Sequence, residues 1–329
     1  MVSRKRTAFV FCGFLWKIRG EEMILSVCMS PSIDVTMELD SLNVGMTNVV
    51  KNKAITLGGK GLNVAIGVAR MGFKSFVTGL MYNENGYVFE NALSGEGVPF
   101  SFVWNKGRVR ENYKLIDSRS MLTEINDVGE AVTEEKAQEV LSIIKTQSAK
   151  SEVTVLSGSL PKGLSASYYG DMVKAVSPNS LKIVDAKGDR LFHALDCGVD
   201  LIKPNLEELE NSIGRRVEDK QDMLDACYEL IDRGAKCVLL SLGKQGAVIT
   251  DGSKSFYCKS LNVAMNSTVG AGDGMVAAAA IRLAEGAPIS EILRAGVAAG
   301  TATVMTTGAV SFTKEKYAEV LGNLRVTEL

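Results

Sequence analysis

The residues whose types and spacing suit chemistry best lie in the segment STVGAGDGMVAAAAIRLAEG, which starts at residue 267. Gly270, Ala271 and Gly272 leave the backbone bare, and the residues after them have strong helix propensity up to a closing glycine. A helix that begins after a bare backbone presents unpaired N–H groups and a positive dipole end to an anion. Asp273 falls in the first turn, where by spacing alone its carboxylate suits helix capping and catalysis equally well.

Phosphoryl transfer is the chemistry that would use both features of this segment. The backbone donors would stabilise charge on the transferring group, and the Asp273 carboxylate would accept a proton from the attacking hydroxyl. The sequence contains no GxxxxGK[ST] and lacks the HRD and DFG elements, which excludes P-loop enzymes and protein kinases.

A second glycine loop, TLGGKGLNVAIGVARMG, covers residues 56–72. The paired glycines predict a tight turn from a strand into a helix that begins near Lys60 and Asn63. Asn63 could reach sugar hydroxyls there, and Lys60 could reach an anion. The same residues also fit a plain strand-to-helix turn with a solvated lysine, so this loop alone is weakly informative.

Composition limits the class of protein. The chain has 329 residues, of which 46% are hydrophobic and 23% charged, with a formal net charge of −1. These values predict a soluble globular protein without a basic field for nucleic acid. Six scattered cysteines without a CxxC pair favour neither a zinc site nor a disulfide framework, and they fit the cytoplasm. The single histidine, His193, is predicted to lie on a helix surface.

The first 22 residues differ from the rest. A basic start precedes the apolar run 7–16, which superficially resembles a signal peptide. The run is shorter than the ~20 residues that a membrane-spanning helix needs, and no small-residue cleavage site follows. We interpret residues 1–22 as an upstream extension or a misassigned start rather than an export signal, and we expect no membrane partner. The folded domain is expected over residues 23–329.

Short apolar runs alternate with amphipathic segments along this domain. The expected strands include residues 24–29, 154–157, 182–185, 201–203, 238–241 and 247–250, and the expected helices 134–150, 165–175 and 219–234. This alternation predicts an α/β fold with a mainly parallel sheet covered by helices on both faces. Ligands bind such sheets beyond the carboxyl ends of the strands, which draws attention to the loops after Ser157, Asp185, Lys203 and Ser241.

Two stretches, residues 34–57 and 100–126, interrupt the alternation. They contain short alternating segments typical of antiparallel strands around turns, and neither contains a convincing helix. We expect them to form one small accessory sheet that covers a site as a lid.

Taken together, the two glycine loops resemble the signature regions of the PfkB carbohydrate kinase family. The resemblance is nearest to the branch that contains 1-phosphofructokinase and tagatose-6-phosphate kinase, and it implies the ribokinase-like three-layer α/β/α fold. The supporting motifs, in chain order, are SPSID (30–34), GGKGLNVA (58–65), RENYK (110–114), TEIN (123–126), SGSLPKG (157–163), KPNLEEL (203–209), SLGKQGA (241–247) and STVGAGDG (267–274).

The resemblance implies a role for each matching position on the sugar side. Asp273 matches the family's catalytic base. Gly270, Ala271 and Gly272 match its anion hole. The positions that match substrate-binding residues are Asp34, Gly59, Lys60, Asn63, Arg110 and Ser157. Within this set, Arg110 and Lys60 are associated with the phosphate that the sugar already carries, a task that suits a guanidinium fork.

The resemblance also implies an ATP site with Mg²⁺. Lys203, Asn205 and Glu208 match an element near the nucleotide phosphates, with Glu208 contacting Mg²⁺ through water. The nucleotide-binding loop is implied at Ser241, Gly243 and Gly246, and the small residues of 298–308 would flank the adenine. The KPNLEEL segment also fits a strand end followed by a helix start with no ligand.

The sequence departs from the family pattern at Ser30, where asparagine is usual, at Val109, where threonine is frequent, and at Gly274, where serine is common. None of these changes removes a charged group. Gly274 should cost the helix roughly 0.5–1 kcal/mol and takes away a hydroxyl.

The leading hypothesis is ATP-dependent phosphorylation of D-fructose 1-phosphate, with tagatose-6-phosphate or fructose-6-phosphate kinase as the near alternative. A nucleoside kinase and an inactive sugar-phosphate sensor are the remote ones. The resemblance also implies a homodimer formed through the lid.

Overall fold

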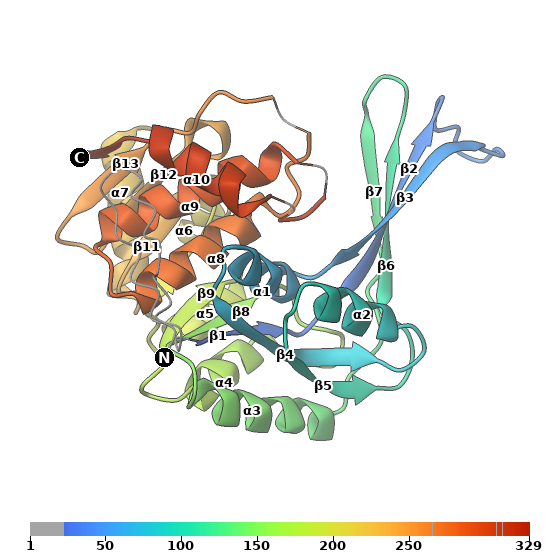
Figure 1. The fold of residues 1–329 in the computed structure, drawn as a ribbon, viewed down its shortest axis with the longest axis horizontal. Coiled ribbons are helices and arrows are strands. Elements are labelled where there is room, and N and C mark those ends of the chain that lie inside the picture. Colours follow the sequence, from blue (N-terminus) through green and yellow to red (C-terminus); the bar gives the residue numbers. More distant parts are fainter. Residues whose placement is uncertain (1–22, 265, 307, 311) are drawn as a thin grey trace, which may run out of the picture.

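The computed structural model describes residues 23–264, 266–306, 308–310 and 312–329, so the interpretation of residues 1–22 lies outside the described chain. A large sheet occupies the centre of the molecule, and a second sheet projects from it (Figure 1). The strands of the large sheet are β1 (Met23–Cys28), β4 (Lys74–Tyr82), β5 (Phe100–Asn105), β8 (Val153–Ser157), β9 (Leu181–Asp185), β10 (Leu201–Ile202), β11 (Val238–Ser241), β12 (Ala247–Thr250), β13 (Ser255–Cys258) and β14 (Val326–Glu328).

These strands pair in the order β14–β13–β12–β11–β10–β9–β8–β1–β4–β5. All pairs from β11 to β5 are parallel, and the three pairs from β11 to β14 are antiparallel. The expected mainly parallel sheet is therefore confirmed. Its parallel strands are nearly continuous apolar runs because both faces are covered.

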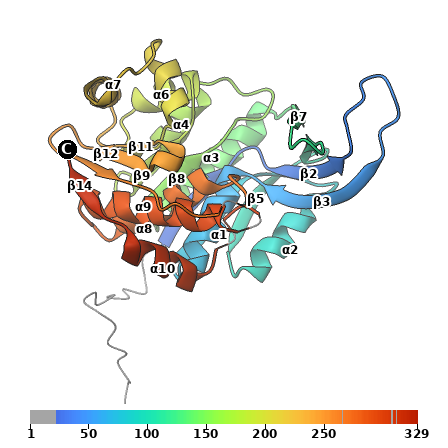
Figure 2. The same cartoon turned by 90° about the horizontal axis from the view of Figure 1, so that it is seen from above.

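Helices cover the large sheet on both faces (Figure 2). One layer contains α1 (Lys60–Arg70), α2 (Tyr87–Gly95), α8 (Ala271–Ala284), α9 (Ile289–Val304) and α10 (Lys314–Asn323). The other contains α3 (Glu134–Ser148), α4 (Tyr168–Ala175), α5 (Asp189–Leu195), α6 (Leu206–Ile213) and α7 (Lys220–Asp232). Each layer packs its own hydrophobic cluster against the sheet, which gives the three-layer arrangement. His193 is exposed on α5, as the sequence predicts.

The second sheet, called the lid below, contains β2 (Ser32–Leu39), β3 (Val50–Gly58), β6 (Arg110–Ile116) and β7 (Leu122–Asn126), in the order β3–β2–β6–β7. Residues 34–57 and the later part of 100–126 thus form one accessory sheet. The expected boundary at residue 100 is corrected, because β5 pairs in parallel with β4 at the edge of the large sheet. A short alternating segment has the same pattern on either sheet, so the sequence did not separate the two.

The first turn of α1 lies directly against β1. The Ser26 hydroxyl donates to the Gly61 carbonyl at 2.7 Å. A Cβ atom added to Gly61 would lie 2.3 Å from the Val27 carbonyl oxygen, so no larger residue fits without moving the helix. This close approach fixes the start of α1, and with it Lys60, relative to the end of β1.

No helix in the part of the chain that the structure describes is long and apolar enough to span a membrane.

Two helical glycines allow the contact between α1 and β1 to be tested. We expect Gly61→Ala to lower the free energy of unfolding by about 1–3 kcal/mol, because the new methyl group overlaps backbone. Gly322→Ala is the matched control: nothing lies within 4 Å of its added Cβ on exposed α10. It should stabilise the protein by about 0.5–1 kcal/mol. Urea unfolding of both variants measures the difference, and equal effects would contradict the packing argument.

Candidate active site

Two pockets meet at the first turn of α8. The larger, about 960 Å³ and called the large pocket, is lined there by Ala271 and Gly272. The smaller, about 340 Å³ and called the lid pocket, is lined by Asp273 and by residues of the lid. A group bound at the start of α8 therefore has access to both pockets. Both lie at the carboxyl-terminal side of the parallel strands, where the sequence predicted a site.

The start of α8 has the features of an anion site. Gly270 is the N-cap residue in the left-handed region, at φ 79°, with its Cβ position 2.8 Å from the Ala309 methyl carbon. The first N–H groups of α8 have no acceptor within the helix, and its dipole favours negative charge there. A Cβ atom added to Gly272 would lie 3.3 Å from the Lys203 ammonium nitrogen. The Lys203 ammonium therefore lies close to the backbone at the start of α8.

Asp273 is 6% exposed and lies in the first turn of α8. Its Oδ2 accepts a hydrogen bond from the Asn63 amide at 2.7 Å, so α1 orients a carboxylate on α8. Burial raises the pKa of Asp273 to about 6, with the Lys60 ammonium acting in the opposite direction. The carboxylate is consequently ionised at pH 7 and more basic than an ordinary aspartate.

Asp185, at the end of β9, connects two lysines. Its Oδ2 lies 3.0 Å from the Lys60 ammonium nitrogen, and its Oδ1 lies 3.5 Å from that of Lys203. Ser157, at the end of β8, donates to Asp185 Oδ2 at 3.2 Å. Burial opposes the charge on Asp185, but Lys203 and Lys60 outweigh it and hold its pKa at about 2.

The lid contributes a second charged group. Asp34 on β2 accepts hydrogen bonds from the Asn112 amide and the Lys114 ammonium, both at 3.0 Å. The register of β2 against β6 places Asn112 opposite Asp34. Arg110, the first residue of β6, has a buried Nε without a partner in the described chain, and only long contacts of 3.4–3.5 Å at Nη1. Its guanidinium is therefore available to a ligand.

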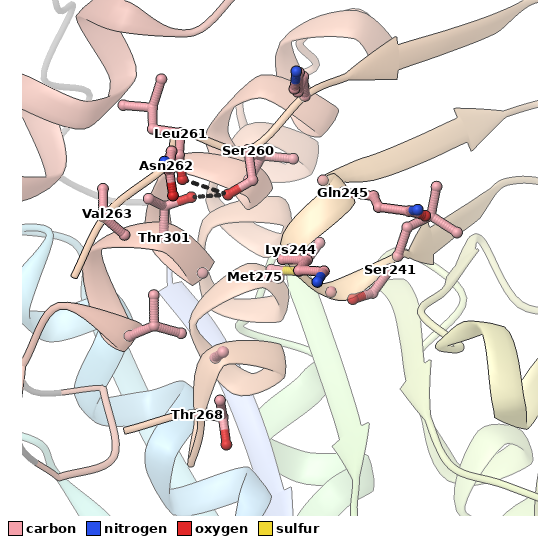
Figure 3. Close-up of a pocket in the computed structure, with 18 of the residues that line it drawn as sticks. Ser241, Lys244, Gln245, Ser260, Leu261, Asn262, Val263, Thr268, Met275 and Thr301 are labelled. Atoms are coloured by element: carbon pink, nitrogen blue, oxygen red, sulfur yellow. Dashed lines mark hydrogen bonds between the residues drawn. The ribbon is translucent and has the colours of Figure 1, made fainter. Parts of the chain in front are cut away.

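The large pocket lies between the β11–β12 connection and α9 (Figure 3). Ser241, Gly243 and Gly246 line it, with the 3₁₀ turn η1 (Gly243–Gln245) between the strands. Its other walls carry valine and leucine side chains and the hydroxyl pair of Ser260 and Thr301, 3.1 Å apart. An apolar cleft of this size with a few polar groups suits a flat heterocycle with a polar tail.

The sequence matches the family described as pfkB family carbohydrate kinase over residues 25–316. The chain belongs to this family. It is 29% identical to a tagatose-6-phosphate kinase of Staphylococcus epidermidis, over 93% of this chain and 100% of that one. It is 30% identical to a 1-phosphofructokinase of Vibrio cholerae, over 77% of this chain and 80% of that one. An ATP-dependent 6-phosphofructokinase isozyme 2 of Mycobacterium tuberculosis is also 30% identical, with 90% and 88% covered.

Among solved structures, phosphofructokinase-2 from Escherichia coli in complex with potassium has a TM-score of 0.82 at 28% identity. The match covers 92% of this chain and 98% of that one. Another structure of the same protein is its tetrameric inhibited form. The expected ribokinase-like α/β fold is confirmed.

In this carbohydrate kinase, Asn205 and Glu208 form a capping box at the start of α6. Asn205 Oδ1 accepts from the Glu208 N–H at 2.8 Å, and Glu208 Oε2 accepts from the Asn205 N–H at 3.0 Å. The KPNLEEL segment therefore forms a strand end followed by a capped helix start, which is one of its two interpretations from the sequence. Glu208 also lines the lid pocket, whereas Asn205 lines neither pocket.

Gly274, one of the three departures from the family pattern, lies where α8 packs closely against α9 in this kinase. A Cβ atom there would lie 2.6 Å from the Thr303 hydroxyl oxygen on α9, and that hydroxyl donates to the Ala299 carbonyl at 2.8 Å. The glycine therefore permits a close contact between α8 and α9 in addition to its helix-propensity cost. Ser30, the second departure, lines the lid pocket. Val109, the third, is buried, and its N–H donates to Asn85.

The structure brings the predicted sugar-side residues together around the lid pocket. Asp34, Gly59, Lys60, Asn63, Arg110, Ser157 and Asp273 all line it. Sequence reasoning missed Asn112, Asp185, Lys187 and Arg190, which also line this pocket. It also missed Lys114, which forms an ion pair with Asp34. For Asp185 a signal existed, because the loop after it was already expected at the ligand-binding edge of the sheet.

Proposed function

We propose that this kinase transfers the γ-phosphoryl group of ATP to a ketohexose phosphate, with D-fructose 1-phosphate converted to fructose 1,6-bisphosphate. The observation that carries the proposal is the buried Asp273 carboxylate, which faces the lid pocket from a bare helix start shared with the large pocket. A base, an anion site and two adjoining pockets are what transfer from a nucleotide to a hydroxyl requires. The three relatives named above are all named as kinases of hexose phosphates.

In the proposed step, Asp273 takes the proton of the C6 hydroxyl while that oxygen attacks the γ-phosphorus in line. The bond from this phosphorus to its bridging oxygen breaks, and ADP leaves with the electron pair. The first N–H groups of α8, around Gly270, Ala271 and Gly272, and the Lys203 ammonium stabilise the charge on the transferring group. Asn63 keeps the carboxylate aimed at the acceptor.

The phosphate of the substrate needs cations that are not already paired. Lys60 and Lys114 each form an ion pair with an aspartate. Three other cations line or border the lid pocket without an ion pair in the described ranges: Arg110, Lys187 and Arg190. We assign the phosphate chiefly to Arg110, whose buried Nε lacks a partner there. In this assignment Lys60 contributes less to binding the substrate phosphate than the sequence analysis predicted.

ATP would occupy the large pocket, with its phosphates directed to the start of α8 past Ser241, Gly243 and Gly246. Mg²⁺ would supply charge neutralisation for these phosphates when it is bound. Glu208 suits a contact through water, because one carboxylate oxygen serves the helix cap and the residue faces the lid pocket. No cluster of three or more His, Cys, Asp or Glu side chains within the described chain would chelate a metal. A Mg²⁺ ion held mainly by the nucleotide and by water needs few protein ligands.

We place the kinase in the cytoplasm, because the cysteines that the structure describes are free thiols and ATP is its phosphoryl donor.

The acceptor is tested by comparing fructose 1-phosphate, tagatose 6-phosphate and fructose 6-phosphate in an assay for ADP release. We expect the highest kcat/KM with fructose 1-phosphate. Preference for tagatose 6-phosphate is the second candidate, since the relative of that name aligns along 93% of this chain. Activity only on adenosine or ribose would favour a nucleoside or sugar kinase instead, and phosphosugar binding without turnover would favour a sensor.

The base is tested by Asp273→Asn. This variant should bind ATP and phosphosugar but lose about 10²–10⁴-fold in kcat, because an amide accepts no proton at neutral pH. Asp222→Asn is the matched control, since Asp222 also lies in the first turn of a helix, α7, away from both pockets. Its kcat should equal that of the wild type. Near-normal turnover by Asp273→Asn would defeat the assignment.

We also propose that the lid forms a homodimer contact. Register places Ile55, Val35, Tyr113 and Ile125 in one row across the lid, on the face opposite Asp34 and Asn112. Ile55 and Ile125 are 58% and 56% exposed. Apolar side chains on an exposed sheet favour burial against a second copy, and a structural relative has a tetrameric form.

Light scattering during size exclusion measures this contact. Ile125→Lys should convert a dimer to monomers, because a charge within an apolar interface is costly to bury. Leu181→Lys, at a position 36% exposed on β9 of the large sheet, should leave the dimer intact. A wild-type protein that is monomeric at micromolar concentration would contradict the proposal.

A further inference from the structure

Asp185 is a charged side chain that the proposed mechanism leaves without a task. It is 1% exposed, yet it is held as a carboxylate between two ammonium groups. A buried charge is costly unless partners compensate for it. Here the partners are Lys60 at 3.0 Å, Lys203 at 3.5 Å and the Ser157 hydroxyl at 3.2 Å.

Only one of the two lysines lines a pocket, and the other lies next to a residue of the second pocket. Lys60 is the first residue of α1 and lines the lid pocket. Lys203 follows β10, and its ammonium lies beside the backbone of Gly272, which lines the large pocket. Asp185 therefore joins one cation from the sugar side with one from the nucleotide side, at the position where the pockets meet.

Asp273 is the other carboxylate within electrostatic reach of these lysines. Lys60 and Lys203 both act to lower the pKa of Asp273, whereas Asp185 acts to raise it. The hydrogen-bond donor to the Asp273 carboxylate is nonetheless a neutral amide, that of Asn63. If Asp185 were uncharged, Lys60 would have no carboxylate partner in its present position and would be drawn to Asp273.

We propose that Asp185 is a positioning residue that holds Lys60 and Lys203 beside their pockets and thereby keeps the Asp273 carboxylate free of an ion pair. The inference rests on the proposed role of Asp273 as the base. An aspartate engaged by an ammonium group is a weaker base and is blocked from the acceptor hydroxyl. Asp185 thus acts on the reaction through the two lysines, without contacting the reacting atoms.

Other charged groups share this region and stay constant in the test. Those around the lid pocket are Asp34 on β2, Arg110 on β6, Lys187 and Arg190 around the start of α5, and Glu208 on α6. Of the groups near Asp273, only Asp185 is changed in the variant below. A shift in the titration of Asp273 then reports the loss of Asp185 and any movement of the lysines that follows.

The test is Asp185→Asn, assayed for kcat and for kcat/KM between pH 5 and 8. In the wild type we expect kcat/KM to fall on the acid side with an apparent pKa of about 6, because protonated Asp273 accepts no proton. In Asp185→Asn this acid limb of the pH profile, the fall in kcat/KM, should move to lower pH by at least about half a unit. The value of kcat should fall about tenfold or more. The substrate phosphate titrates near pH 6 as well, but identically with both enzymes.

The control is Asp200→Asn. Asp200 is an aspartate 11% exposed that pairs with Lys236 at 2.8 Å and lines neither pocket. Its removal should leave the acid limb in place. A folded Asp185→Asn enzyme whose limb coincides with that of the wild type would overturn the proposal, because a purely structural role would not move it. Asp273→Asn separates the proposed role of Asp185 from that of Asp273. If that variant is active, the assignment of Asp273 as the base is wrong.

A double variant guards against misfolding of Asp185→Asn. Adding Lys60→Met removes one of the two ammonium groups left without a counter-charge. We expect the double variant to unfold at a higher temperature than Asp185→Asn and to have its acid limb back near that of the wild type. Two results would count against the proposal: a double variant no more stable than the single one, or a limb as low as that of Asp185→Asn.

Discussion

The hydrogen bond from Asn63 to Asp273 joins two side chains 210 residues apart, and the arrangement of the site depends on it. It can form only because α1 and α8 lie very close to each other. At Gly67 an added Cβ would be 3.0 Å from the Ala277 methyl carbon. Residues 277–280 of α8 are all alanines and are fully buried. Small side chains therefore determine how near the two glycine loops come, and hence where the Asp273 carboxylate lies.

Burial then decides what the charges in the site do. Asp273 and Asp185 are both nearly inaccessible to water, but their partners differ. A neutral amide leaves Asp273 with a pKa of about 6, while two ammonium groups hold that of Asp185 at about 2. One carboxylate is thus a base near neutral pH and the other a permanent anion. The difference arises because Asp185 contacts two lysines and Asp273 contacts an asparagine, although both residues are aspartates in the same cleft.

The lid completes the site from outside the large sheet. Its parallel register between β2 and β6 brings Asp34 and Asn112 to the same side as Arg110, facing the pocket. The opposite side of the same strands carries exposed isoleucines. Because successive side chains of a strand alternate between faces, one sheet can both bind a ligand and present an apolar surface to a second copy. The substrate binding and the dimer contact that we propose would thereby be linked through four strands.

The sequence by itself determined the fold class, the family, the helix start at Asp273 and the expected ligand edge of the sheet, because these depend on local propensity and on motifs with little spacing freedom. It also contained both interpretations of Asn205 and Glu208, whose capping box is local. The tertiary structure alone decided that β5 joins the large sheet, since an alternating segment does not reveal its partner strand. It alone revealed Asp185 between Lys60 and Lys203, 125 and 18 residues away along the chain. Ion pairs between distant residues depend on how strands and helices stack, and that order is set by the packing of the whole chain.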